Sequence, residues 1–155
     1  MLSSALRTKL RFAASSSTSC TKDRANKVTD RWDCYLFTPH RRPWDSDLTH
    51  ILVELHHPSA ERDATAWAAQ DFASKKKGYP GADGWTPTTL GDEALRSPDV
   101  DQTYVLFRVQ NVTVVVSAAL GDEDKAENPK LLAEQGRRAW RVATDLARSL
   151  TKLRQ

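Results

Sequence analysis

The clearest alternation of hydrophobic and polar positions lies in residues 103–118, TYVLFRVQNVTVVVSA. A two-residue turn at Gln110 and Asn111 would join two antiparallel strands, although asparagine tolerates positive φ more readily than glutamine. This turn pairs Val109 with Val112, Phe107 with Val114 and Val105 with Val116. These six side chains share one face, and a shift of one residue would destroy that segregation. The pattern therefore predicts a β-hairpin with one apolar face and one mixed face.

Shorter apolar alternations predict three further strands, over residues 10–14, 31–38 and 48–57. In residues 31–38, aromatic side chains point to both faces, which is typical of a strand that is covered at least partly on each side. No strand is predicted for the serine-rich residues 15–19, the polar and exposed residues 21–30, the turn-rich residues 79–87 or the turn at 96–101.

Two longer segments have the periodicity of amphipathic helices. Residues 60–77 follow Ser59, a favourable N-cap, and end in three lysines that complement the helix dipole. Residues 130–153 follow Asn128 as N-cap and Pro129 at the first helical position. The expected packing stripe of the first helix is Ala64, Trp67, Ala68 and Phe72. That of the second is Leu132, Gly136, Ala139, Ala143, Leu146, Leu150 and Leu153.

Together these elements predict an α+β fold, with an antiparallel sheet of about five strands and two main helices packed on it. We expect one domain over residues 1–155, which is long enough to bury a substantial core. A hydrophobic content of 39% and a charged content of 28% are typical of a globular protein. No apolar run approaches 18 residues, so the chain is not expected to be transmembrane.

The net charge of +3 hides an uneven distribution along the chain. Residues 1–42 carry a net charge of +6, residues 43–135 carry −8 and residues 136–155 carry +5. The basic residues thus lie at the two ends of the chain, without a basic patch interleaved with aromatics. We therefore predict no nucleic-acid binding, despite a pI near 9.0.

The first 22 residues contain no acidic side chain and are rich in serine and arginine. This composition superficially fits a mitochondrial transit peptide, whereas no hydrophobic signal-peptide region follows Met1. The alternative is that Met1 lies inside a longer reading frame, with a leader encoded upstream.

The candidate catalytic and metal-binding residues are few. His50 and His56 share a strand face, but six residues of strand separate them by roughly 20 Å, too far for one metal ion. Glu54 and His56 can share a metal only with ligands from elsewhere in the chain. The six glycines form no phosphate-binding loop, and no nucleophile motif is present. We predict a protein with no metal, no cofactor and no catalytic residues; an enzyme would require a pocket with convergent ionisable groups.

The two cysteines, Cys20 and Cys34, leave several readings open. A bridge would close a loop of about 15 residues and contribute roughly 3 kcal/mol in the chain-entropy model. Two buried free thiols are the alternative, and a metal site would need further ligands.

Five tryptophans occur in the sequence. Trp32, Trp67 and Trp140 fit core positions, whereas Trp44 and Trp85 lie in proline-containing loops. Loop tryptophans line a binding cleft or cap the edge of a core. With Tyr79, which begins the turn-rich stretch 79–87, they form the candidate ligand cleft of Trp44, Tyr79 and Trp85.

Several short motifs are formed by Gly91, Asp92, Glu93, Ala94, Arg108, Asn111 and residues 112–116. These motifs resemble those of actinobacterial cell-envelope domains, which are small secreted proteins and lipoproteins of unknown or sensor-like function, and the extracellular sensor domains of some serine/threonine kinases. Gln110 departs from the pattern, which usually has glycine there, and SSTSC follows no apolar stretch as a lipidated cysteine would. A cysteine followed by a Trp-x-Cys strand is also similar, so the resemblance implies a Cys20–Cys34 bridge.

The resemblance implies a non-catalytic cell-envelope module that binds a small ligand or an envelope protein partner. An extracellular or envelope location would then require a leader upstream of this start. The alternatives are a cytoplasmic interaction or regulatory module, which reduced and independent cysteines would favour, and a small enzyme with an unidentified site. The sequence identifies neither the ligand nor the oligomeric state.

Overall fold

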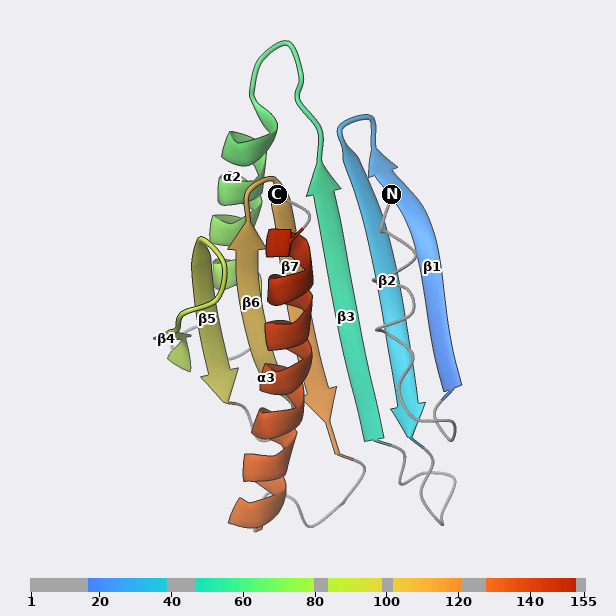
Figure 1. Cartoon of the computed structure of the whole chain (residues 1–155), viewed down its shortest axis with the longest axis vertical. Helices are drawn as coiled ribbons and strands as arrows, with labels where there is room; N and C mark the ends of the chain where they lie inside the picture. Colours follow the sequence, from blue (N-terminus) through green and yellow to red (C-terminus); the bar gives the residue numbers. More distant parts are fainter. Residues whose placement is uncertain (1–16, 39–46, 80–83, 99–101, 121–127, 153–155) are drawn as a thin grey trace.

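The computed structural model describes residues 17–38, 47–79, 84–98, 102–120 and 128–152. Figure 1 shows its elements along the chain. They are β1 (Ser17–Asn26), β2 (Thr29–Thr38), β3 (Asp47–His56), α2 (Ala64–Gly78), β4 (Thr86–Pro87), β5 (Glu93–Pro98), β6 (Thr103–Val109), β7 (Val112–Ala119) and α3 (Pro129–Lys152). The predicted strand at residues 10–14 lies outside the described residues.

The strands form one antiparallel sheet in the order β1-β2-β3-β7-β6-β5-β4. The α+β class and the two main helices are confirmed, but the prediction of about five strands is wrong, because the described sheet has seven. The additional strands are β1, β4 and β5. Among the described strands β1 is a polar edge strand that pairs with β2 alone, so it needs no apolar alternation to be stable. β4 is two residues long, and β5 ends at Pro98, within the stretch read as a turn.

The hairpin of β6 and β7 has the predicted register: Val109 pairs with Val112, Phe107 with Val114 and Val105 with Val116. In the turn, the residue with positive φ is Gln110, at 52°, rather than the asparagine that follows it. The Gln110 N–H donates to Asp92 Oδ2 at 2.5 Å. Asn111 is instead anchored to the end of β3, because its Nδ2 donates to the His56 carbonyl at 2.8 Å. These two contacts hold a turn whose first residue is conformationally unfavourable.

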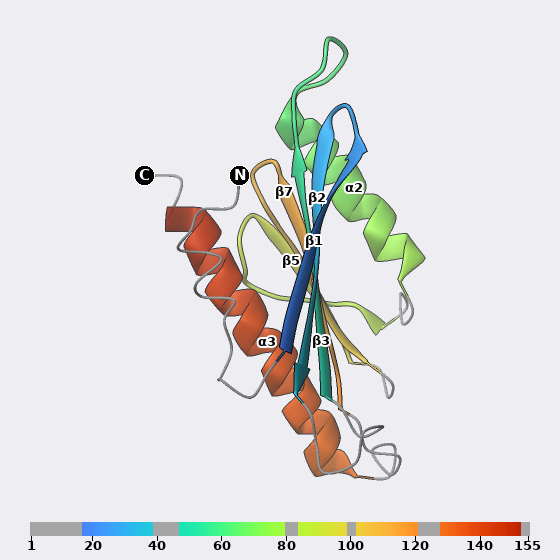
Figure 2. The same cartoon turned by 90° about the vertical axis from the view of Figure 1, so that its right-hand side faces the viewer.

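The two helices lie on opposite faces of the sheet, as the edge-on view in Figure 2 shows. α3 packs on β6 and β7 from one side, and α2 packs on β3, β6 and β7 from the other. The alternation of strand side chains therefore serves two cores. The α3-side core includes Trp32, Cys34, Leu36, Ile51, Val53, Val105, Phe107, Val114, Val116, Ala139, Ala143 and Leu146. The α2-side core is smaller and consists of Leu52, Phe72, Leu95, Tyr104, Leu106 and Val115.

The helix ends show which caps the chain uses. Asn128 caps α3 as predicted, since its Oδ1 accepts from the Lys130 N–H at 3.1 Å. α2 begins at Ala64 rather than at residue 60, and its N-cap is Asp63, whose Oδ1 accepts from the Ala66 N–H at 2.9 Å. Ser59 instead closes a preceding turn by accepting from the Glu61 and Arg62 N–H groups. In the described part of the chain, neither helix is both long and apolar enough to cross a membrane.

Candidate functional site

Cys20 and Cys34 form a disulfide, with Cα atoms 4.1 Å apart. They are direct partners in the antiparallel pairing of β1 with β2, so the bridge links the edge strand to the strand beside it. The predicted bridge is thus confirmed. Cys34 is buried in the α3-side core, whereas Cys20 is exposed. Such a bridge fits an oxidising environment outside the cytoplasm.

The structure places two of the three predicted cleft residues. Tyr79 contacts Tyr104 edge to face, with ring centroids 5.4 Å apart, and the Trp85 Nε1–H donates to the Lys76 carbonyl at 2.9 Å. Both side chains pack against the edge of the α2-side core. Trp44 lies outside the described residues, so a cleft formed by all three stays a prediction.

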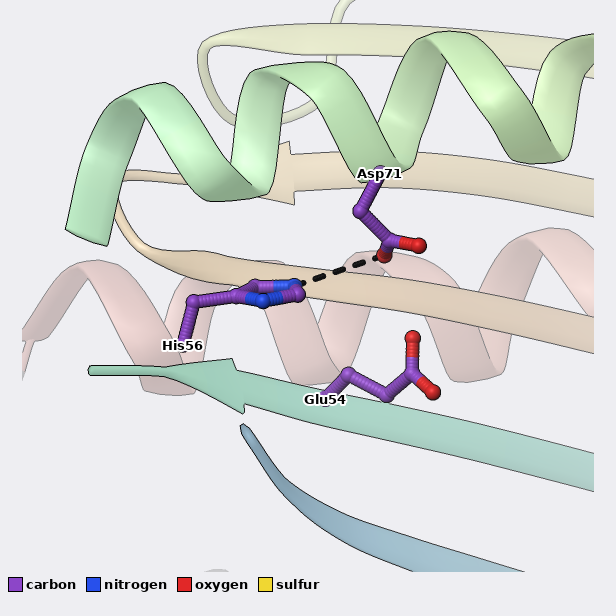
Figure 3. A group of neighbouring side chains, drawn as sticks. All are labelled: Glu54, His56 and Asp71. Atoms are coloured by element: carbon purple, nitrogen blue, oxygen red, sulfur yellow. Dashed lines mark ion pairs between the residues drawn. The ribbon is translucent and has the colours of Figure 1, made fainter. Parts of the chain in front are cut away.

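The α2 face of the sheet contains a polar group that we call the β3–α2 cluster: Glu54, His56, Asp71 and Lys75. Glu54 and His56 lie two residues apart on β3, so their side chains point to the same face. Asp71 and Lys75 are four residues apart on α2 and share one side of the helix. Figure 3 shows Glu54 and His56 pointing up from β3 toward Asp71. Packing of the helix on the strand therefore brings four ionisable groups together.

Lys75 holds the two carboxylates of the cluster. Its ammonium group donates to Asp71 Oδ1 at 2.6 Å and to Glu54 Oε2. The side chains of Lys75 and Glu54 are 14% and 10% exposed, so this ion-pair network is largely shielded from water. His56 Nε2 lies 3.4 Å from Asp71 Oδ2, the pair marked in Figure 3. That oxygen is buried and has no well-aligned hydrogen-bond donor, so we regard the contact as electrostatic.

Two threonines satisfy the imidazole of His56. The Thr29 hydroxyl lies 3.4 Å from Nδ1, and the Thr113 hydroxyl lies 3.4 Å from Nε2 and donates to the Ala68 carbonyl. Because the Thr113 hydroxyl proton is used in that bond, its oxygen accepts from His56 Nε2–H. Both ring nitrogens of His56 are therefore contacted by a threonine hydroxyl.

The charges in the cluster shift two pKa values. Burial of Asp71 disfavours its charged form, but the contacts with His56 and Lys75 outweigh this and lower its pKa well below the ordinary 3.8. Burial of Lys75 likewise opposes its charge, and the hydrogen bonds to Asp71 and Glu54 outweigh it and raise its pKa. At neutral pH both groups are therefore ionised.

Beside the cluster lies a cavity of about 240 Å³. Besides Glu54, His56 and Asp71, its lining consists of Asn26, Thr29, Trp67, Gln70 and Ser74. Trp67 Nε1 is buried without a hydrogen-bond partner. The cavity wall thus combines acceptors with one unused donor, an arrangement that suits a small polar molecule or water.

One ligand atom each from Glu54, His56 and Asp71 lies within 4.8 Å of the others. An imidazole and two carboxylates are donors that divalent transition metals accept. The Lys75 ammonium already bridges the two carboxylates, so a metal ion would have to displace it. As the side chains stand, the cluster is a buried ion-pair network that fastens α2 to β3.

A second region is defined by Tyr35, Phe37 and His50, which we call the aromatic strip. All three lie on the α2 side of the sheet, Tyr35 and Phe37 on β2 and His50 opposite Tyr35 on the neighbouring β3. The Tyr35 ring stacks on His50 at 4.6 Å and on Phe37 at 6.4 Å between centroids. Tyr35 is 36% exposed and Phe37 39% exposed, and they are the exposed large hydrophobic side chains of the described chain.

Asp33 extends the aromatic strip with a charged group. His50 Nε2 lies 2.7 Å from Asp33 Oδ1, and Arg31 Nη2 lies 3.2 Å from Asp33 Oδ2. Burial raises the pKa of Asp33, but the contacts with His50 and Arg31 outweigh that effect and lower it. The region therefore presents a flat aromatic surface next to a carboxylate fixed in position by two neighbours.

Sequence reasoning had identified parts of these regions but not their assembly. Glu54 and His56 were paired correctly on one strand face, and the missing partner proved to be Asp71 on α2. The sequence feature that points to Asp71 is its i, i+4 spacing with Lys75 on the predicted helix. The aromatics of β2 were expected to be partly covered on both faces, whereas Tyr35 and Phe37 are exposed because α2 packs further along the sheet.

No protein-family model matches the chain, and neither a curated protein nor a solved structure is detectably similar to it. The resemblance to actinobacterial envelope domains therefore stays a prediction.

Proposed function

We propose that this protein is a non-catalytic module that binds a ligand or a protein partner through the aromatic strip. The observation that carries this proposal is the exposure of Tyr35 and Phe37 side by side, stacked with His50, on a sheet face that is otherwise covered or polar. Contiguous exposed apolar side chains rimmed by polar groups are a common mark of an interaction site.

The energetics support a binding role for the strip. Covering apolar surface contributes about 25 cal/mol per Å², and aromatic side chains offer the largest area for the least conformational entropy. The stacking on His50 and the His50–Asp33 contact hold the rings in place before any ligand arrives. Little ordering cost would therefore offset the gain on binding.

We propose that the protein acts outside the cell or within the cell envelope. The Cys20–Cys34 bridge supports this location, because disulfides persist in oxidising compartments and are rare in the cytosol. A cytoplasmic interaction module is the alternative, and the bridge counts against it.

The test screens immobilised oxidised protein against two libraries, displayed random 12-residue peptides and an array of oligosaccharides. We expect binders that lose at least tenfold in affinity on the double variant Tyr35→Ser/Phe37→Ser. The variant Arg141→Ser, at an exposed position on α3, is the matched control and should retain binding. Binders that bind the double variant as tightly as the native protein would contradict the proposal.

A second candidate function, binding of a divalent cation, rests on the three ligand atoms of the β3–α2 cluster. Since Lys75 occupies the position between the carboxylates, Lys75→Met should bind Zn²⁺ more tightly than the native protein does. Calorimetric titration with ZnCl₂ measures this, and adding His56→Ala to Lys75→Met should abolish the gain. No detectable Zn²⁺ binding by the native protein would exclude this function, whatever the affinity of Lys75→Met.

A further inference from the structure

We propose that the outer edge of β1 accepts an extended segment of a partner protein as an eighth strand, with large apolar side chains of that segment lying over the aromatic strip. This inference rests on the proposed function and specifies its partner. Four features of β1 carry it: an open edge, an uncharged half, small side chains beside the strip and a covalent link to β2.

The first feature is the open edge. β1 is the terminal strand of the sheet and pairs only with β2 in the described part of the chain (Figure 1). The Cα atoms of Cys20 and Cys34 are 4.1 Å apart, the short spacing of a pair that exchanges no backbone hydrogen bonds. The N–H and C=O groups of Thr18, Cys20 and Lys22 therefore point away from β2. Another β-strand is the partner that satisfies such a row of groups.

The second feature is the distribution of charge along β1. Natural edge strands commonly carry charged side chains, which discourage pairing with other chains. Lys22 and Asp23 provide such charges in one half of β1, whereas residues 17–21, STSCT, have none. The uncharged half is thus the part of the edge on which another strand can add.

The third feature is the position of that half relative to the aromatic strip. In the β1–β2 pairing, Ser19 is opposite Tyr35 and Thr21 is opposite Asp33. A strand added to β1 would lie two strand spacings, roughly 10 Å, from β2. Only small hydroxyl side chains intervene on this face, so a Leu, Met or Phe of the added strand can reach across Ser19 to the Tyr35 ring.

The fourth feature is the Cys20–Cys34 disulfide, which fixes β1 to β2 within the uncharged half. An edge strand held in this way loses little conformational freedom when another strand pairs with it. The bridge therefore prepares the edge for binding.

A second copy of this chain is a less suitable occupant. Two copies that pair through β1 would separate their Tyr35 residues by three strand spacings, roughly 14 Å. Both aromatic strips would then remain exposed. A partner segment with apolar residues at alternate positions both covers the aromatic strip and pairs with the outer edge of β1.

The experiment follows amide hydrogen exchange by NMR on the oxidised full chain, with and without the tightest peptide from the displayed 12-residue library. We expect peptide binding to slow exchange at least tenfold at the Thr18, Cys20 and Lys22 amides. The Ser19 and Thr21 amides, which face β2, are internal controls and should change little. In the peptide, N-methylation at alternate positions should abolish binding in one register and be tolerated in the other.

The outcomes separate the two proposals. Strip-dependent peptide binding without protection of Thr18, Cys20 and Lys22 would overturn strand addition while leaving the proposed function intact, as would binding of oligosaccharides alone. Peptide binding that the Tyr35→Ser/Phe37→Ser variant does not weaken would overturn both the proposed function and strand addition. Protection of the same three amides that grows with protein concentration, without peptide, would identify a second copy as the occupant and overturn the partner proposal.

Discussion

The two faces of the sheet are built from the same strands but differ in what they bury. On the α3 face, Val105, Phe107, Val114 and Val116 are completely buried in the larger apolar core. The polar contacts of α3, from Gln135 to Thr103 and the Leu120 N–H and from Arg138 to Asp47, lie at the end of the sheet where β3 and β6 begin. On the α2 face, a smaller apolar core lies beside the β3–α2 cluster, and the surface beyond the helix is exposed. The α3 face is held mainly by apolar packing, whereas the α2 face combines a smaller apolar core with a central ion-pair cluster and an exposed surface.

This difference indicates where function is placed in the molecule. A predominantly apolar core supplies stability, and a charge buried in it without a partner would be costly. The opposite face can carry polar groups because the α3 side already provides the larger core. The predictions below test this division, from the largest expected effect to the smallest.

The first prediction concerns the α3 face. Phe107→Ala should lower the free energy of unfolding by about 3–5 kcal/mol, because it removes a completely buried ring. Urea denaturation of the oxidised protein measures this. Tyr35→Ser, on the exposed part of the α2 face, is the comparison and should cost no more than about 1 kcal/mol. Similar losses for the two variants would show that the faces do not differ as described.

The second prediction concerns the β3–α2 cluster. Lys75→Met should destabilise the protein by about 2–4 kcal/mol at neutral pH, because two largely buried carboxylates lose their counter-charge. Protonation of those carboxylates in acid should recover part of the loss. Thermal or urea unfolding across pH measures both effects. Lys76→Met, at the exposed neighbouring position, is the matched control, and an equal effect of the two substitutions would exclude the ion-pair role.

The third prediction concerns the disulfide. Replacing both cysteines, Cys20→Ser/Cys34→Ser, should cost about 3 kcal/mol by the loop-closure estimate. The protein purified without reductant should show no mass increase with a thiol-alkylating reagent until it is reduced. Ready double alkylation of the native protein would mean that the thiols are free, and the envelope proposal would lose its support.

The fourth prediction is the pH dependence that Asp71 contributes. Its pKa is lowered in the folded protein, so its charge contributes stability that is fully present above the ordinary 3.8. This stability is lost as pH falls through the lower pKa of the folded state. Between about pH 5 and about pH 3 the native protein should lose about 1 kcal/mol more than Asp71→Asn does. If the free energy of unfolding, measured with urea, fell equally with pH in the native protein and in Asp71→Asn, the contribution of Asp71 would be disproved.

The sequence predicted the elements whose stability depends on local periodicity. The register of the β6–β7 hairpin followed from six apolar residues that had to share a face, and Asn128 marked the start of α3. The edge strand β1 escaped prediction because a strand that is exposed on most sides needs no apolar pattern. Its evidence is tertiary, in the pairing of Cys20 with Cys34 on β2.

The candidate sites depended still more on tertiary structure. The alternation of Glu54 and His56 and the i, i+4 spacing of Asp71 and Lys75 are visible in the sequence, but each describes only one element. Their meeting requires α2 to pack on the face of β3 opposite α3, and no local pattern specifies the face on which a helix packs. The exposure of Tyr35 has the same origin, because it follows from where α2 lies across the sheet. The sequence by itself thus determined the hairpin and the two helices, since periodic burial is a local property. Only the tertiary structure decided which residues meet between them and which remain exposed, because those depend on contacts between distant segments.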